Sequence, residues 1–157
     1  MRAEALPKIF KTLADPTRLR ILSLLEQEEL AVQELTEVLG MTQSRVSRHL
    51  GILREAAVVR DRREGTFVLY QLALPVEGAW RAAWEVAARD LRADPSHARD
   101  RAALAQVLEA RAGRSRSFFD AVAPEWDALG NDLEGSTDVE VVAGQETKAT
   151  VRLSDQR

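Results

Sequence analysis

Apolar residues recur at intervals of three and four through the first part of the chain, and polar residues fill the positions between them. This period is typical of helices that bury one face. Four such stretches are found, at residues 3–13, 16–25, 32–39 and 43–56. Asp15 and Pro16 mark the start of the second stretch, because a carboxylate caps free amides and proline loses no hydrogen bond at the first helical position. In that helix we expect Arg18 and Arg20 to lie near the solvent.

The third and fourth stretches are joined by a very short turn. Gly40 can adopt the left-handed conformation that ends a helix, and Thr42 offers a hydroxyl to cap the next one. Two short helices joined by a tight turn that contains glycine are the layout of a helix-turn-helix.

After residue 57 the pattern changes to short runs rich in β-branched and aromatic residues. Residues 58–62 and 66–72 flank Arg63, Glu64 and Gly65, and the glycine supplies the positive φ that a hairpin turn needs. The pattern therefore predicts a β-hairpin wing, which Pro75 ends.

Helical spacing returns beyond the hairpin. Residues 76–92 predict one helix and residues 96–111 another, with Ser96 as its cap and His97 as an exposed residue at its start. The predicted fold is mainly α with a small β-hairpin wing, that is, a winged helix-turn-helix followed by C-terminal helices. We divide it into a winged helix-turn-helix domain (residues 1–93), a helical extension (94–129) and an acidic tail (130–157). The tail is expected to be partly disordered or to form a small hairpin.

Composition limits the class of protein. The chain has 157 residues, of which 45% are hydrophobic and 30% charged, so one main core is expected. Charges interrupt every apolar run, and the first residues lack a signal peptide's apolar segment, which predicts a soluble cytoplasmic protein that does not enter a membrane. Cysteine is absent, which excludes disulfides, thiolate metal ligands and cysteine nucleophiles.

The net charge of -3 conceals an uneven distribution. Six arginines stand against three acidic residues between residues 41 and 70, whereas nine acidic residues stand against five basic ones from residue 113 onward. The helix-turn-helix and wing are thus basic, as contact with phosphates requires.

The start of the fourth helix carries the residues suited to reading DNA. With Val46 and Leu50 buried, its outward surface holds Gln43, Ser44, Ser47 and Arg48. Glutamine pairs with adenine and arginine with guanine in the major groove, and each good bidentate pair discriminates by about 1–3 kcal/mol. We expect Arg45 and the wing to contact phosphates or the minor groove. The full predicted DNA-binding set is Thr42, Gln43, Ser44, Arg45, Ser47, Arg48, His49, Arg60, Arg62, Arg63 and Thr66.

A simpler interpretation is that these polar faces are only solvated surface, which for a single arginine is at least as common as DNA contact. Their order favours DNA binding, because the caps, turn glycine, serine-rich helix and arginine-bearing hairpin follow one another within about sixty residues, each placed by its own local signal.

These residues resemble a known family. Residues 13–22, with residues 43–50 and Leu53, closely resemble the arsenic-repressor (ArsR-type) winged-helix regulators, and the likeness covers about residues 6–72. It implies a homodimer that binds a pseudo-palindromic operator in double-stranded DNA as a repressor released by a signal. The interface implied lies on the first helix and the helix after the wing. Its predicted residues are Leu6, Ile9, Phe10, Leu13, Trp80, Trp84 and Leu91, for which an intramolecular core is the alternative.

Many members of that family bind metal through two cysteines on the third helix, or through histidine and carboxylates on the helix after the wing. Ala31 and Gln33 occupy the cysteine positions, and residues 76–92 contain no histidine. With only His49 and His97 in the chain, we expect no metal site and no cofactor. A small organic effector, a partner protein or the regulator's own concentration remain alternatives as the signal.

Residues 117–129 resemble the helix that leads into class I methyltransferase domains. A strand and a glycine-rich turn should follow in such a domain, but residues 130–137 hold neither. We therefore predict a DNA-binding regulator that is not an enzyme. The alternatives are a remnant that binds S-adenosylmethionine or S-adenosylhomocysteine, and a dimerisation scaffold that does not bind DNA.

Overall fold

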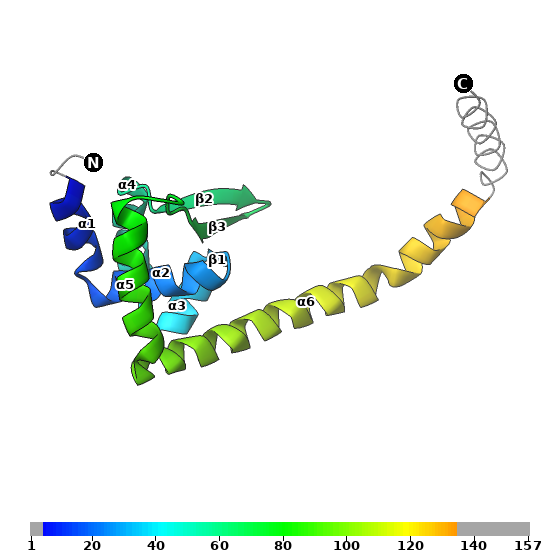
Figure 1. The fold of residues 1–157 in the computed structure, drawn as a ribbon. Coiled ribbons are helices and arrows are strands. Elements are labelled where there is room, and N and C mark those ends of the chain that lie inside the picture. The colour runs from blue at the N-terminus through cyan, green and yellow to red at the C-terminus, as the bar shows by residue number, and fades with distance from the viewer. Residues whose placement is uncertain (1–4, 135–157) are drawn as a thin grey trace, which may run out of the picture. The chain divides into compact units, whose positions relative to one another are not determined.

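The computed structural model describes residues 5–134 of the chain, and side-chain exposure for residues 5–123 (Figure 1). Helices dominate, and two of the three strands of a small antiparallel sheet follow the fourth helix. The elements in chain order are α1 (Ala5–Leu13), α2 (Pro16–Gln27), β1 (Leu30–Ala31), α3 (Val32–Leu39), α4 (Gln43–Glu55), β2 (Val59–Glu64), β3 (Phe67–Leu72), α5 (Ala79–Ala93) and α6 (Pro95–Glu134). The predicted class, mainly α with a β wing, is confirmed.

One hydrophobic core joins α1 to α5 and the first turns of α6. Ile21 and Leu22 of α2, Leu35 of α3 and Val46 of α4 have no exposed surface, and Trp84 of α5 is 1% exposed. Burying a side chain of this size contributes about 1.5–3 kcal/mol relative to leaving it in water. The core therefore fixes how α3 and α4 present their outer faces.

The start of α2 forms as the sequence predicted. The Arg18 backbone N–H donates to Asp15 Oδ1 at 3.0 Å, and Pro16 is the first helical residue. The expectation that Arg18 lies near solvent is wrong: its side chain is 12% exposed, and its guanidinium donates to the carbonyls of Thr12 and Lys11 at 2.6 and 3.0 Å. Arg18 thereby satisfies carbonyls at the end of α1 and fixes the angle between α1 and α2.

Gly40 ends α3 in the left-handed conformation, with φ at 63°, as predicted. Its amide donates to the Thr36 carbonyl at 3.0 Å, and α4 begins three residues later. Thr42 precedes α4, but its hydroxyl makes no capping hydrogen bond to the helix and lies 3.4 Å from the Ser44 hydroxyl instead. The predicted hydroxyl cap is therefore wrong in its contact.

The wing has a third strand that the sequence did not reveal. The strand order is β1-β3-β2, all antiparallel, with Leu30 opposite Tyr70 and Arg62 opposite Leu69. β1 has only two residues, Leu30 and Ala31, too few to show an alternating pattern. Gly65 has a φ of 60° in the turn between β2 and β3, which confirms the predicted hairpin turn.

The C-terminal helices differ from the prediction in four respects. α5 begins at Ala79, after Gly78 with a φ of 102°, and α6 is one helix from Pro95 to Glu134 rather than two. The cap of α6 is Asp94 and not Ser96, because the Ser96 N–H donates to Asp94 Oδ1 at 2.8 Å. His97 is not exposed but buried, at 7% exposure.

The chain divides into two compact units, and the first of them runs to Ala110 within α6. Residues 130–134, predicted to belong to an acidic tail, are helical in α6. The rest of that tail, including the proposed hairpin, lies outside the described residues.

Candidate nucleic-acid interface

The outer surface of α4 carries the predicted base-reading residues together. Gln43, Ser44, Ser47 and Arg48 are all exposed. Beneath them Val46 and Leu50 are 0% and 1% exposed and attach the helix to the core. Because the apolar face is fully used in packing, the polar face can only point outward. Arg45 is also exposed, on the same first turns of the helix.

His49 differs from the other predicted DNA contacts, because it turns inward. Its side chain is 13% exposed, and Nδ1 lies 3.9 Å from Asp15 Oδ1 with no hydrogen-bond partner in the described structure. Burial lowers the pKa of His49, and the charges of Arg18, Arg45 and Arg48 lower it further against the opposing effect of Asp15. His49 thus connects α4 to the start of α2 rather than joining the exposed set.

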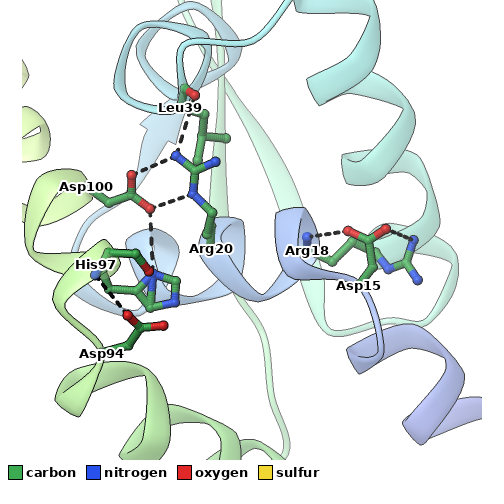
Figure 2. A network of polar contacts seen from close by, with 8 residues as sticks. Asp15, Arg18, Arg20, Leu39, Asp94, His97 and Asp100 are labelled. Atoms are coloured by element: carbon green, nitrogen blue, oxygen red, sulfur yellow. Dashed lines mark hydrogen bonds and ion pairs between the residues drawn. The ribbon is translucent and has the colours of Figure 1, made fainter.

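Asp15 contacts both His49 and Arg18, and its contacts with Arg18 are drawn in Figure 2. Burial alone would raise the pKa of Asp15, but the Arg18 backbone N–H and the charges of Arg18 and His49 hold that pKa below 3.8. The carboxylate therefore caps α2 and stands beside the recognition helix with its negative charge at neutral pH.

The four predicted wing residues, Arg60, Arg62, Arg63 and Thr66, are all exposed. Arg62 is bound by carboxylates. Its Nε donates to Glu29 Oε2 at 2.7 Å, and its Nη2 forms ion pairs with Glu29 Oε2 at 2.7 Å and Glu64 Oε2 at 3.0 Å. Glu29 raises the pKa of Arg62, with a smaller contribution from Glu64. The sequence alone does not reveal the contact between Glu29 and Arg62, because it spans 33 positions.

The predicted interface residues fall into two groups. Ile9, Leu13, Trp84 and Leu91 are between 1% and 9% exposed and pack in the hydrophobic core, which is the alternative that the sequence left open for them. Leu6 and Phe10, by contrast, are 39% and 61% exposed on α1, and Trp80 on α5 is half-buried. Helical spacing identifies the apolar residues of α1 and α5, but it does not show which of them pack into the core and which stay exposed. The sequence alone therefore could not separate the two groups.

A partly buried polar cluster connects α2 to the beginning of α6 (Figure 2). Arg20 Nε donates to Asp100 Oδ2 at 2.7 Å, and Arg20 Nη2 donates to Asp100 Oδ1 at 2.8 Å. His97 Nδ1 lies 3.9 Å from Asp100 Oδ2. The expectation that Arg20 faces solvent is therefore wrong, because Asp100 holds it against α6.

Within residues 5–134 no group of three or more potential metal-binding side chains comes together. Over the same range no helix is long and apolar enough to cross a bilayer. Ala31, at one of the two positions where relatives of the expected family carry cysteine, is 4% exposed in β1, and Gln33 is exposed on α3.

Three helices that end in an exposed polar recognition helix, followed by an antiparallel hairpin with arginines on it, define a winged helix-turn-helix protein. Residues 15–61 match the model of the bacterial regulatory protein, arsR family. These residues include α2, α3 and α4, the elements that carry the exposed polar surface.

Relatives agree with the family model. Over 80 residues the chain is 44% identical to the uncharacterized HTH-type transcriptional regulator Rv0081 of Mycobacterium tuberculosis, covering 48% of this chain and 70% of the relative. It is 51% identical over 67 residues to arsenic resistance transcriptional regulator ArsR1 of Pseudomonas putida, covering 42% of this chain and 52% of that one. It is 38% identical over 64 residues to transcriptional repressor SdpR of Bacillus subtilis, covering 41% and 71%. The chain belongs to the arsR family of bacterial regulatory proteins, and the matched part spans about half the length of ArsR1.

The crystal structure of Rv0081 covers 69% of this chain and 94% of its own, at 35% identity and a TM-score of 0.47. The family is one of regulators and not of enzymes. The likeness of residues 117–129 to a methyltransferase helix finds no support, because the family model that matches covers residues 15–61 and is one of regulators.

Proposed function

We propose that this protein is a sequence-specific DNA-binding transcriptional repressor that acts as a homodimer, with α4 of each subunit in the major groove. The observation that carries the proposal is the exposed polar face at the start of α4, where Gln43, Ser44, Ser47 and Arg48 stand outward over the buried Val46. Helix-turn-helix proteins read bases with the N-terminal residues of this helix.

The side chains differ in what they can recognise. Gln43 is suited to adenine and Arg48 to guanine, while Ser44 and Ser47 accept or donate as the base requires. Arg45 is assigned to a phosphate, where it contributes affinity but no sequence preference. Arginines of the wing add contacts to the backbone beside the groove.

A homodimer is supported by the apolar surface of α1. Leu6 and Phe10 expose large hydrophobic side chains on one helix, and Trp80 is half-buried on α5, which packs against α1. Regulators of this family bind operator DNA as homodimers. Two copies related by a twofold axis would place their α4 helices on a pseudo-palindromic operator.

We propose that the signal that releases the repressor from DNA is not a metal bound at Ala31 and Gln33. Ala31 has no ligand atom in its side chain and is buried, and the chain contains no cysteine to replace it. An organic molecule, a partner protein or a change in the regulator's own concentration would fit this composition.

Fluorescence anisotropy with the promoter DNA of the protein's own gene and with a scrambled duplex tests the proposal. Gln43→Ala and Arg48→Ala should each reduce the preference for the promoter by about 5- to 150-fold, since a bidentate base contact is worth about 1–3 kcal/mol. Arg45→Ala should weaken binding to both duplexes alike and lower the salt slope by about one. Gln33→Ala, an exposed glutamine on α3, is the matched control and should change neither.

Equal binding of the parent protein to both duplexes would overturn the assignment of sequence specificity. If the protein binds neither duplex at low salt, the winged helix serves as a dimerisation scaffold instead. In that case Arg48→Ala would also leave transcription of the neighbouring genes unchanged.

A further inference from the structure

One face of the wing sheet carries a series of polar contacts that runs from the residue before β1 to β3 and β2. Arg60, Arg62 and Glu64 alternate with Asp61 and Arg63 along β2, so the first three share one face. On that face Arg60 pairs in register with Gln71 of β3, and Glu29 directly precedes β1. Residues from the connector, β3 and β2 thus meet on a single surface.

Glu29 organises this surface through both of its oxygens. Oε2 accepts a hydrogen bond from Arg62 Nε and forms an ion pair with Arg62 Nη2, both at 2.7 Å. With the Gln71 amide nitrogen facing Glu29, that nitrogen donates to Oε1 at 3.1 Å, and the Gln71 oxygen accepts from Arg60 Nε at 2.9 Å. One carboxylate therefore orients Arg62 directly and Arg60 through Gln71.

The charges on the two faces of β2 are consequently unequal. Glu29 and Glu64 both lie within 3.0 Å of Arg62, which is 46% exposed and carries its positive charge between them. Arg63, on the opposite face, is exposed and has no carboxylate partner among the residues that the structure describes. A phosphate approaching the wing would have to displace two carboxylates to reach Arg62, but none to reach Arg63.

We propose that Glu29 is a positioning residue of the DNA interface: it holds Arg62 on the sheet as a structural tie between the α2–β1 connector and the wing. Arg63 is then the cation of β2 that contacts the DNA backbone. This inference rests on the proposed function, because it assigns roles within the same interface.

The consequence is a prediction about ions released on binding. Each phosphate contact made by a cation contributes about 0.9 to the slope of log K against log salt, so one additional contact changes affinity about 3.5-fold between 50 and 200 mM salt. Arg63→Gln should lower the slope by about one. Glu29→Gln should free Arg62 for the backbone, raise the slope by about one and strengthen binding to scrambled DNA more than to the promoter.

The deciding variant is the double substitution Glu29→Gln with Arg62→Gln. This variant removes the Glu29–Arg62 ion pair and both of its charges, so its slope of log K against log salt should equal that of the parent. A slope lower by about one in this double variant would show that Arg62 itself contacts phosphate, and would overturn the proposal. Glu28→Gln is the matched control, because it removes the same charge one position earlier in the connector and should leave the slope as in the parent.

A measurement on the free protein separates this inference from the proposed function. The Nε–H proton of Arg62, observed by NMR, should exchange slowly with water in the parent and in Glu28→Gln, and rapidly in Glu29→Gln. Rapid exchange in the parent would overturn the tie whether or not DNA binds. Slow exchange in a protein that binds neither duplex would sustain the tie and reject the DNA-binding function alone.

Discussion

Arg20 of α2 and Asp100 of α6 form a bidentate ion pair, with Nε to Oδ2 at 2.7 Å and Nη2 to Oδ1 at 2.8 Å. The pair joins positions 80 residues apart. The Asp100 side chain is 9% exposed and that of Arg20 27%, so Arg20 is the cationic partner of a carboxylate that lies largely out of water. The geometry also explains why α6 starts where it does against the core.

Removing Arg20 should therefore cost more than an exposed ion pair is worth. We expect Arg20→Gln to lower the free energy of unfolding by about 2–4 kcal/mol, because it leaves a buried carboxylate without its partner. Urea unfolding followed by circular dichroism measures this. Arg101→Gln, one position beyond Asp100 and exposed, is the control and should stay within about 0.5 kcal/mol of the parent. Equal effects of both substitutions would contradict the role of the pair.

The Asp15 cap makes a second prediction. Asp15→Ala should lower the free energy of unfolding by about 1 kcal/mol through loss of the hydrogen bond to the Arg18 amide, whereas Asp15→Asn keeps a capping oxygen and should cost less. Thermal unfolding of both variants at pH 7 makes the comparison. The idea fails if asparagine and alanine are equally destabilising.

The burial of the His49 side chain makes the free energy of unfolding depend on pH. Burial and the charges of Arg18, Arg45 and Arg48 keep the pKa of folded His49 below 6.5, although Asp15 opposes them. The unfolded chain then binds more protons just below pH 6.5, so stability falls as the pH drops through that value. His49→Gln should flatten this part of the curve, which urea midpoints at successive pH values would reveal.

Asp15 acts in a lower pH window. Its pKa is depressed below 3.8 in the folded protein, so its stabilisation is present above that value and is lost as pH falls through the depressed pKa. Asp15→Asn should remove this acid limb while His49→Gln retains it. A parent protein with constant stability between pH 7 and pH 3 would be inconsistent with both assignments.

Two neighbours on α1 should respond differently to substitution. Phe10 is 61% exposed, so Phe10→Glu should shift the protein toward the monomer in analytical ultracentrifugation and leave its helical content unchanged. Ile9 is 1% exposed, so Ile9→Ala should cost about 2–4 kcal/mol of stability through the cavity it creates. An unchanged sedimentation coefficient for Phe10→Glu would remove α1 from the proposed interface.

The helix-turn-helix could be predicted from the sequence because its signals are local. Asp15 before a proline and Gly40 at a helix end act within one turn, and both behave in the structure as expected. Asp94 before Pro95 repeats the first signal, whereas the sequence pattern was interpreted with Ser96 as the cap. In the structure the Ser96 backbone N–H donates to Asp94, as the Arg18 N–H does to Asp15, and this hydrogen bond lowers the pKa of Asp94.

What could not be predicted depends on distant partners. Glu29 lies 33 positions from Arg62, and Asp100 lies 80 from Arg20, so neither pair leaves a trace in periodicity. His97 is buried because α6 begins against the core, which its own neighbours do not encode. The exposed face of α4 was accessible to prediction only because the buried stripe beneath it determines where polar residues point.

The short strand β1 has a mechanical consequence for the wing. It pairs only with Leu69 and Tyr70, so the part of β3 at Phe67 and Val68 is hydrogen-bonded on one side alone. At Leu69 and Tyr70, β3 is paired with a strand on each side, so this part of the hairpin is held more rigidly than the tip around Gly65. The tip can then adjust to the groove width of each operator, while the three-stranded part of the sheet keeps α4 in position.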